Sequence, residues 1–188
     1  MGYGDRYVVG AVGSYYDGCT MRPLSLLALN FSLVISTRAE SNSDIEKQLI
    51  GAWKLVSATQ TLADGTTRPS PAYGPHQAGY MIYTDTHLMC SVNVNQDRPQ
   101  WASPAAPADA EMKTAFGGFG AYCATFTVNA ADKSVTHHVQ FDKSPNAAGT
   151  DRKRFFTLQG NRLVLKIDPK ENPPGVTENT ITWERVAK

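Results

Sequence analysis

Hydrophobic and polar residues alternate with a period of two over most of the chain after Ile45. Eight such runs can be followed, at residues 53–59, 80–84, 88–94, 122–128, 135–141, 156–158, 163–167 and 178–186. Gly, Asp, Asn and Pro separate the runs, as in the turn at Asp64-Gly65. Alternation between such turns is typical of β-strands with one buried face, so we expect about eight short strands.

One segment favours a helix instead. Residues 107–116 (PADAEMKTAF) begin with a proline, carry acidic residues early and end at Gly117-Gly118. Ala108, Met112 and Ala115 would share one side of this helix, which is a candidate lid over a barrel mouth or a simple plug. Many antiparallel strands with one short helix favour an all-β barrel or a sandwich. A sandwich fills its interior, whereas a closed eight-stranded barrel can hold one small ligand.

The beginning of the chain differs from this pattern. The stretch 24–35 (LSLLALNFSLVI) is apolar, but a membrane-spanning helix needs roughly 20 residues. Arg22 precedes the stretch, and small residues up to Ala39 follow it, which is typical of a secretory signal peptide at about residues 21–39. Met21 would begin that peptide. The alternative is an ordinary apolar segment of a cytosolic protein.

This interpretation divides the chain into an N-terminal extension, 1–43, and a barrel domain, 44–188. Residues 1–20 would lie upstream of the signal peptide. Export would place the protein in the periplasm or outside the cell, and otherwise it would be cytoplasmic. Cleavage would remove Cys19 and leave Cys90 and Cys123, which either pair in an oxidising compartment or remain buried thiols.

The composition excludes several classes of function. The chain is 41% hydrophobic and 19% charged, which is typical of a globular domain. Its net charge of +1 provides no field that would attract nucleic acid or an anionic membrane. Three cysteines have no zinc-binding spacing. No phosphate-binding loop, nucleophile elbow or paired-carboxylate motif is visible, so the sequence predicts no metal and no cofactor.

Several segments occur together in a recognisable order. They are GAWKLVS at 51–57, GYMIYT at 79–84, DRP at 97–99, VTHHV at 135–139, and Pro145-Asn146 with Gly149-Thr150. Over essentially all of residues 45–188 they resemble the bacterial and fungal lipocalin-like domain family. The resemblance implies a calycin-type β-barrel with a central cavity. Some related lipocalin-like proteins assist cyclisation or isomerisation in secondary metabolism.

The first of these segments contains the Gly-x-Trp of lipocalins, at Gly51-Ala52-Trp53. Gly51 would let the chain approach closely at the barrel floor, and Trp53 would plug that end. Arg185, on the last strand, is placed to lie over the indole as a cation–π partner. The family's usual loop residues are replaced at 85–87 and around the Pro-Asn pair, which puts inherited loop contacts in doubt but not the barrel.

His137 is the candidate catalytic residue and a candidate ligand-binding residue. Neighbouring side chains on a strand point to opposite faces, so His137 and His138 cannot chelate one metal together. His137 shares its face with Val135, Val139 and Phe141, which we expect to point inward. It is either a hydrogen-bonded core residue or a polar group of the cavity able to exchange a proton near neutral pH.

Arg154 is the second polar candidate. It alternates with Phe156 and Leu158, so if those face the core, Arg154 does too, and a buried arginine needs a partner. That partner is either an internal carboxylate or an anionic group of a ligand. The remaining predicted ligand-binding residues are aromatic, namely Tyr80, Tyr122, Phe126 and Phe156, and ordinary core positions are the alternative for each.

We therefore expect a single all-β, calycin-like antiparallel barrel of about eight strands with one short helix. Its predicted function is to hold a small apolar or aromatic molecule in the barrel cavity. The alternative is a cofactor-independent isomerase or cyclase for a polyketide- or terpenoid-like substrate, in which His137 and a neighbouring Tyr would move a proton.

Overall fold

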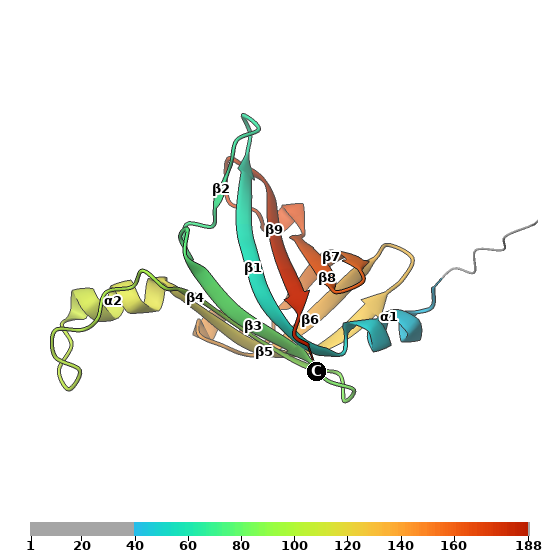
Figure 1. Cartoon of the computed structure of the whole chain (residues 1–188), viewed down its shortest axis with the longest axis horizontal. Helices are drawn as coiled ribbons and strands as arrows, with labels where there is room; N and C mark the ends of the chain where they lie inside the picture. Colours follow the sequence, from blue (N-terminus) through green and yellow to red (C-terminus); the bar gives the residue numbers. More distant parts are fainter. Residues whose placement is uncertain (1–39, 188) are drawn as a thin grey trace, which may run out of the picture. The chain divides into compact units, whose positions relative to one another are not determined.

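The computed structural model describes residues 40–187. These residues form nine β-strands, two α-helices and two 3₁₀ helices (Figure 1). The strands are β1 (Gly51–Leu62), β2 (Thr67–Pro69), β3 (Gln77–Tyr83), β4 (Leu88–Asn95), β5 (Phe119–Asn129), β6 (Ser134–Asp142), β7 (Asp151–Gln159), β8 (Arg162–Ile167) and β9 (Val176–Arg185). The helices are α1 (Asn42–Leu49), α2 (Asp109–Gly117), η1 (Pro145–Ala147) and η2 (Pro169–Glu171).

The sheet closes on itself as a barrel. All pairings are antiparallel, β1 and β3 to β9 follow one another around the sheet, and β9 pairs with β1 to complete the circle. The short β2 adds to β1 as an extra strand. The predicted all-β barrel, rather than a sandwich, is therefore confirmed. Closure pairs every strand of the circle on both sides and leaves an interior surrounded by side chains.

The floor of the barrel forms around Trp53. Its side chain is fully buried, its indole nitrogen donates to the Leu49 carbonyl over 2.8 Å, and the Arg185 guanidinium lies 4.1 Å from the ring centroid. Gly51 has a positive φ of 131°, and a Cβ there would lie 2.8 Å from the Arg185 guanidinium. The predicted contacts of Gly51, Trp53 and Arg185 are thus present, and the positive φ at residue 51 is a conformation that glycine adopts without strain.

A helix that the sequence analysis did not predict precedes the first strand. In α1 the Ser41 hydroxyl accepts from the Asp44 backbone N–H, and the Asp44 carboxylate accepts from the Ser41 N–H, which makes a capping box. Ile45 and Leu49 are buried against the same core as Trp53. The arginine at the end of β9 fixes the helix end, since Arg185 donates to the Ile50 and Gln48 carbonyls.

The predicted helix at residues 107–116 is present as α2, but it has no buried residue. Met112, expected on its packed side, is exposed. Lys143 donates to the Phe116 carbonyl near the end of the helix. Figure 1 shows α2 extending outward from the ends of β4 and β5, and none of its residues lines the cavity in the barrel. The structure therefore does not support the lid or plug interpretation.

A β-bulge changes the face on which one predicted core residue lies. On β6, Val135, His137 and Val139 point inward as expected, whereas Phe141 is 70% exposed. The pairing with β5 slips at this point, because Cys123 pairs with Phe141 and the next residue, Ala124, pairs with Val139. The extra residue, Gln140, shifts the alternation by one position and turns Phe141 to the outer surface.

Cys90 and Cys123 form a disulfide. They pair directly across β4 and β5 on the outer face of the barrel, with Cα atoms 4.1 Å apart. This resolves the choice between pairing and free thiols that the sequence left open. The signal peptide predicted at residues 21–39 and Cys19 lie outside the described residues, and the domain boundary at residue 43 stays a prediction.

Candidate functional site

The barrel interior contains a cavity of about 450 Å³. The part of β1 beyond the floor contributes Ala58, Thr59 and Gln60 to it. The other strands and connections add several polar side chains, namely Ser91, Asn93, Tyr122, Asp142, Arg152, Arg154, Glu171 and Asn179. Ala58, Ile167, Pro173 and Ile181 provide apolar wall. The volume is in the usual range for a small-molecule site, and the mixture of apolar wall with a few polar groups is typical of one.

The inner face of β4 is polar where it borders this cavity. Ser91 and Asn93 are both more than nine-tenths buried, and the Asn93 amide nitrogen lies 3.5 Å from the Ser91 hydroxyl. The Asn93 Oδ1 atom has no hydrogen-bond partner among residues 40–187. This oxygen lies against Gly79 of the neighbouring strand β3, where an added Cβ would approach it to 2.3 Å.

Two arginines line the cavity, and each has a carboxylate partner. Arg154 donates through Nη1 to both oxygens of Glu171, at 2.9 and 3.0 Å. Arg152 approaches the buried Asp142 carboxylate at 2.8 Å, and its guanidinium lies 4.6 Å from the centroid of the Tyr122 ring. Arg154 thus has the internal carboxylate that was one of its two predicted partners. The two ion pairs leave this wall balanced in charge.

Behind Tyr122 lies a buried group of three hydrogen-bonded side chains. The Tyr122 hydroxyl is 2.9 Å from Nδ1 of His137, and the Tyr83 hydroxyl is 2.7 Å from Nε2. His137 and Tyr83 are completely buried, whereas Tyr122 reaches the cavity. Both ring nitrogens of His137 are therefore occupied, and a proton passing between His137 and a ligand would have to travel through Tyr122.

The surroundings keep all three groups uncharged at neutral pH. Burial, together with the positive charges of Arg154 and Arg152, lowers the pKa of His137 from 6.5 to about 3. Burial raises the pKa of Tyr83 well above its usual value. Burial also raises the pKa of Tyr122, although the two arginines oppose this shift. His137 is thus a neutral imidazole with one N–H donor and one acceptor nitrogen.

Lowering the pH is expected to destabilise the protein through His137. The unfolded chain binds a proton at this residue below about pH 6.5, and the folded chain does so only near pH 3. The contribution is complete above the unfolded pKa and is lost as the pH falls. Between pH 7 and pH 5 the free energy of unfolding should drop by about 2 kcal/mol through this group, as measured by urea denaturation.

The matched control for this prediction is a second histidine on β6. His138 is hydrogen-bonded to Asp151 at the outer surface, so His138→Gln should keep the loss between pH 7 and pH 5. His137→Gln should remove most of that loss, whatever its stability at pH 7. An unchanged pH dependence in the His137 variant would show that the imidazole is not buried in its neutral form.

The structure places the remaining predicted residues in different surroundings. Tyr122 and Arg154 line the cavity. Phe126 is buried below it, edge-on to Tyr83 with ring centroids 4.9 Å apart, and belongs to the core. Tyr80 is 55% exposed on the outer face of β3, so its predicted position in the cavity wall is corrected. Met81 and Tyr83 have the inward positions of that strand.

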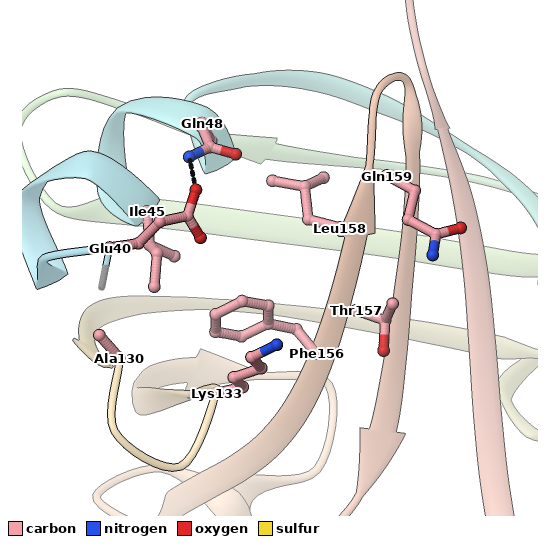
Figure 2. A pocket seen from close by; sticks show the side chains of 9 residues that line it. All are labelled: Glu40, Ile45, Gln48, Ala130, Lys133, Phe156, Thr157, Leu158 and Gln159. Carbon is pink, nitrogen blue, oxygen red and sulfur yellow. Dashed lines mark hydrogen bonds between the residues drawn. The ribbon is translucent and has the colours of Figure 1, made fainter. Parts of the chain in front are cut away.

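Phe156 belongs to a second cavity, which Figure 2 shows between α1, the β5–β6 turn and β7. This cavity has a volume of about 440 Å³. Ile45 and Phe156 supply its apolar surface, and the hydrogen bond between Gln48 and Glu40 spans its α1 side (Figure 2). Its polar residues are exposed, whereas the barrel cavity is lined by the buried residues Ser91, Asn93 and Arg154.

Sequence reasoning missed several residues of the site. Tyr83 is not among the predicted ligand-binding residues, because the sequence analysis places the other face of β3, which carries Tyr80, toward the cavity. Ser91 and Asn93 were missed because apolar neighbours suggested that the other face of β4 was the buried one. Glu171 comes from η2, seventeen residues after its partner Arg154, and no local pattern connects the two.

Metal and membrane features are missing from residues 40–187. No group of three or more His, Cys, Asp or Glu side chains there is arranged to hold a metal ion. No helix in that range has the length and hydrophobicity needed to span a bilayer.

Comparison with known proteins identifies the family. A solved crystal structure of a mutant of the fluorescent protein UnaG matches with a TM-score of 0.37 and 7% sequence identity, over 76% of this chain and 99% of the other. No curated protein sequence matches. A family model described as the lipocalin-like domain matches residues 50–186, which is most of the chain and includes all nine strands. This chain therefore belongs to the lipocalin-like domain family.

Proposed function

We propose that the protein binds a small, largely apolar or aromatic molecule that also carries polar groups. The observation that supports this most directly is the cavity of about 450 Å³ in the barrel interior, whose lining includes the buried polar residues Ser91 and Asn93. A cavity that served only packing would be small and apolar, whereas this one contains polar groups that have been withdrawn from water.

The charge balance of the cavity narrows the kind of molecule. Arg152 and Arg154 are each paired with a carboxylate. They therefore attract an anionic group of a ligand more weakly than an unpaired arginine would. The apolar wall around Ile167 and Ile181 suits a ring or short chain. A neutral molecule with hydrogen-bonding atoms at one end fits both observations.

Filling part of the cavity is expected to weaken this binding. Ser91 points into the cavity, so Ser91→Phe should weaken binding of the neutral fluorescent probe N-phenyl-1-naphthylamine by at least about tenfold, or 1.4 kcal/mol. The measurement is a fluorescence titration with the folded variant. Val92→Phe is the matched control, because it adds the same ring to the outer face of the same strand.

Two results would contradict the proposal. One is the absence of saturable probe binding to the wild-type protein. The other is an equal loss of affinity in the Ser91 and Val92 variants, which would place the probe on the outer surface rather than in the barrel.

We also propose that the protein is exported. The leader-like pattern at residues 21–39 supports this, and so does the Cys90–Cys123 disulfide, since disulfides persist mainly in oxidising compartments. N-terminal sequencing of protein from the producing cell is the test. A new N-terminus close to residue 40 is expected, and a chain that keeps residues 21–39 would contradict export.

A further inference from the structure

The hydrogen bonds among Tyr83, His137 and Tyr122 have a fixed direction. The three neutral groups carry three polar hydrogens, namely two hydroxyl protons and one ring N–H. Only two contacts connect them, so two of the hydrogens lie between the groups and the third must emerge at one end. That end is either the Tyr83 hydroxyl or the Tyr122 hydroxyl.

Burial decides which end this is. Tyr83 is completely buried, and His137 is its only hydrogen-bond partner among the described residues. A proton directed away from His137 there would have no acceptor, and an unpaired buried donor destabilises the folded protein. Tyr83 therefore donates to Nε2, the ring proton is on Nδ1, and Nδ1–H donates to the Tyr122 oxygen. The remaining proton is that of Tyr122, the one member that lines the cavity.

We propose that Tyr122 recognises a carbonyl oxygen of the bound molecule by donating its hydroxyl proton to it. This rests on the proposed function and specifies its ligand class, a neutral aromatic or alicyclic carbonyl compound. Each donor in the chain polarises the next, which strengthens the final hydrogen bond. Because Tyr122 stays protonated, it offers a donor rather than a negative charge.

The neighbouring groups favour a neutral carbonyl over an anion. Glu171 and the Lys153 carbonyl accept hydrogen bonds from Nη1 of Arg154, and no described residue accepts one from Nε or Nη2. Arg154 and Tyr122 line the same cavity, and the positive charge of Arg154 opposes the rise in the pKa of Tyr122. A carbonyl oxygen placed there would accept from Tyr122 beside a guanidinium whose net charge Glu171 already balances.

The direction of the hydrogen bonds among Tyr83, His137 and Tyr122 can be measured in the protein without a ligand. Nitrogen-15 NMR of the wild-type protein should find His137 neutral, with its proton on Nδ1 rather than on the Nε2 that free histidine prefers. Tyr83→Phe removes the only group that fixes this tautomer, so the Nδ1–H form should lose its dominance. An Nε2–H tautomer in the wild-type protein would overturn the inference.

Recognition of the carbonyl is tested with a matched pair of probes, 2-acetylnaphthalene and 2-ethylnaphthalene, which differ in the oxygen. Tyr122→Phe should weaken binding of the ketone roughly three- to tenfold, the value of one hydrogen bond, and change the affinity for the hydrocarbon less than about twofold. Tyr73→Phe is the control, because Tyr73 lines the same cavity but is not one of the three hydrogen-bonded residues Tyr83, His137 and Tyr122.

The outcomes separate the inference from the proposed function. If both probes bind the wild-type protein but Tyr122→Phe affects them equally, or Tyr73→Phe weakens the ketone as much, the inference fails and the binding function stands. If neither probe binds in the barrel, the proposed function fails for this ligand class and the carbonyl assignment fails with it.

Discussion

Replacing Trp53 by alanine is expected to lower the free energy of unfolding by about 3–5 kcal/mol. The side chain is completely buried at the barrel floor, donates a hydrogen bond to the Leu49 carbonyl and lies under the Arg185 guanidinium. Its removal leaves a cavity, takes the indole donor from the Leu49 carbonyl and takes the cation–π partner from Arg185. Because a domain of this size is stabilised by only about 5–15 kcal/mol, the variant should be close to unfolding in urea titrations.

Two further variants keep this prediction testable if the alanine variant does not fold. Trp53→Phe retains most of the ring and should cost less, whereas Trp101→Ala, at a residue that is 40% exposed, should change stability by less than about 0.5 kcal/mol. Equal effects of Trp53→Ala and Trp101→Ala would show that the floor does not depend on the indole.

The barrel floor is the part of the molecule that the sequence predicts best. Gly51, Trp53 and Arg185 have constraints that come from chemistry rather than from context: a glycine where the chain must approach closely, a large ring, and a cation to cover it. Alternation likewise places His137 and Arg154 inside, because both lie on strands whose apolar neighbours point the same way.

The opposite faces of β3 and β4 could not be assigned by the same argument. Tyr80, Ile82, Leu88 and Val92 look like core residues but are exposed, while Ser91 and Asn93 are buried. Hydrophobic alternation identifies a buried face only when the interior is apolar. Here the interior next to β4 is a polar cavity, so the rule predicts the wrong face.

The outward turn of Phe141 and the partners of the two arginines depend on tertiary structure. A bulge adds one residue between Val139 and Phe141, and nothing in the local sequence marks its position. Asp142, at the end of β6, and Glu171, in η2, are recognised as the partners of Arg152 and Arg154 only in the folded structure. Tyr122 and Arg154 could thus be found from the sequence, whereas the network that gives Tyr122 its role could not.

Removing the Cys90–Cys123 disulfide is expected to lower the free energy of unfolding by about 3–4 kcal/mol. The bond closes a loop with a sequence separation of 33, and the conformational entropy that such a cross-link removes from the unfolded chain corresponds to this value. In the folded protein the hydrogen bonds between β4 and β5 already hold the two cysteines opposite each other. The Cys90→Ala/Cys123→Ala double variant should therefore keep its fold and unfold at lower urea concentration.

The comparison requires that no other thiol takes part, so Cys19 is replaced by serine in every sample. Wild-type protein unfolded with a reductant present should then match the double variant, since both lack the cross-link. The single variants should behave as the double variant does, because either one breaks the bond. A double variant as stable as the oxidised protein would mean that the two cysteines are not joined in solution, and this result would also remove the disulfide as support for export.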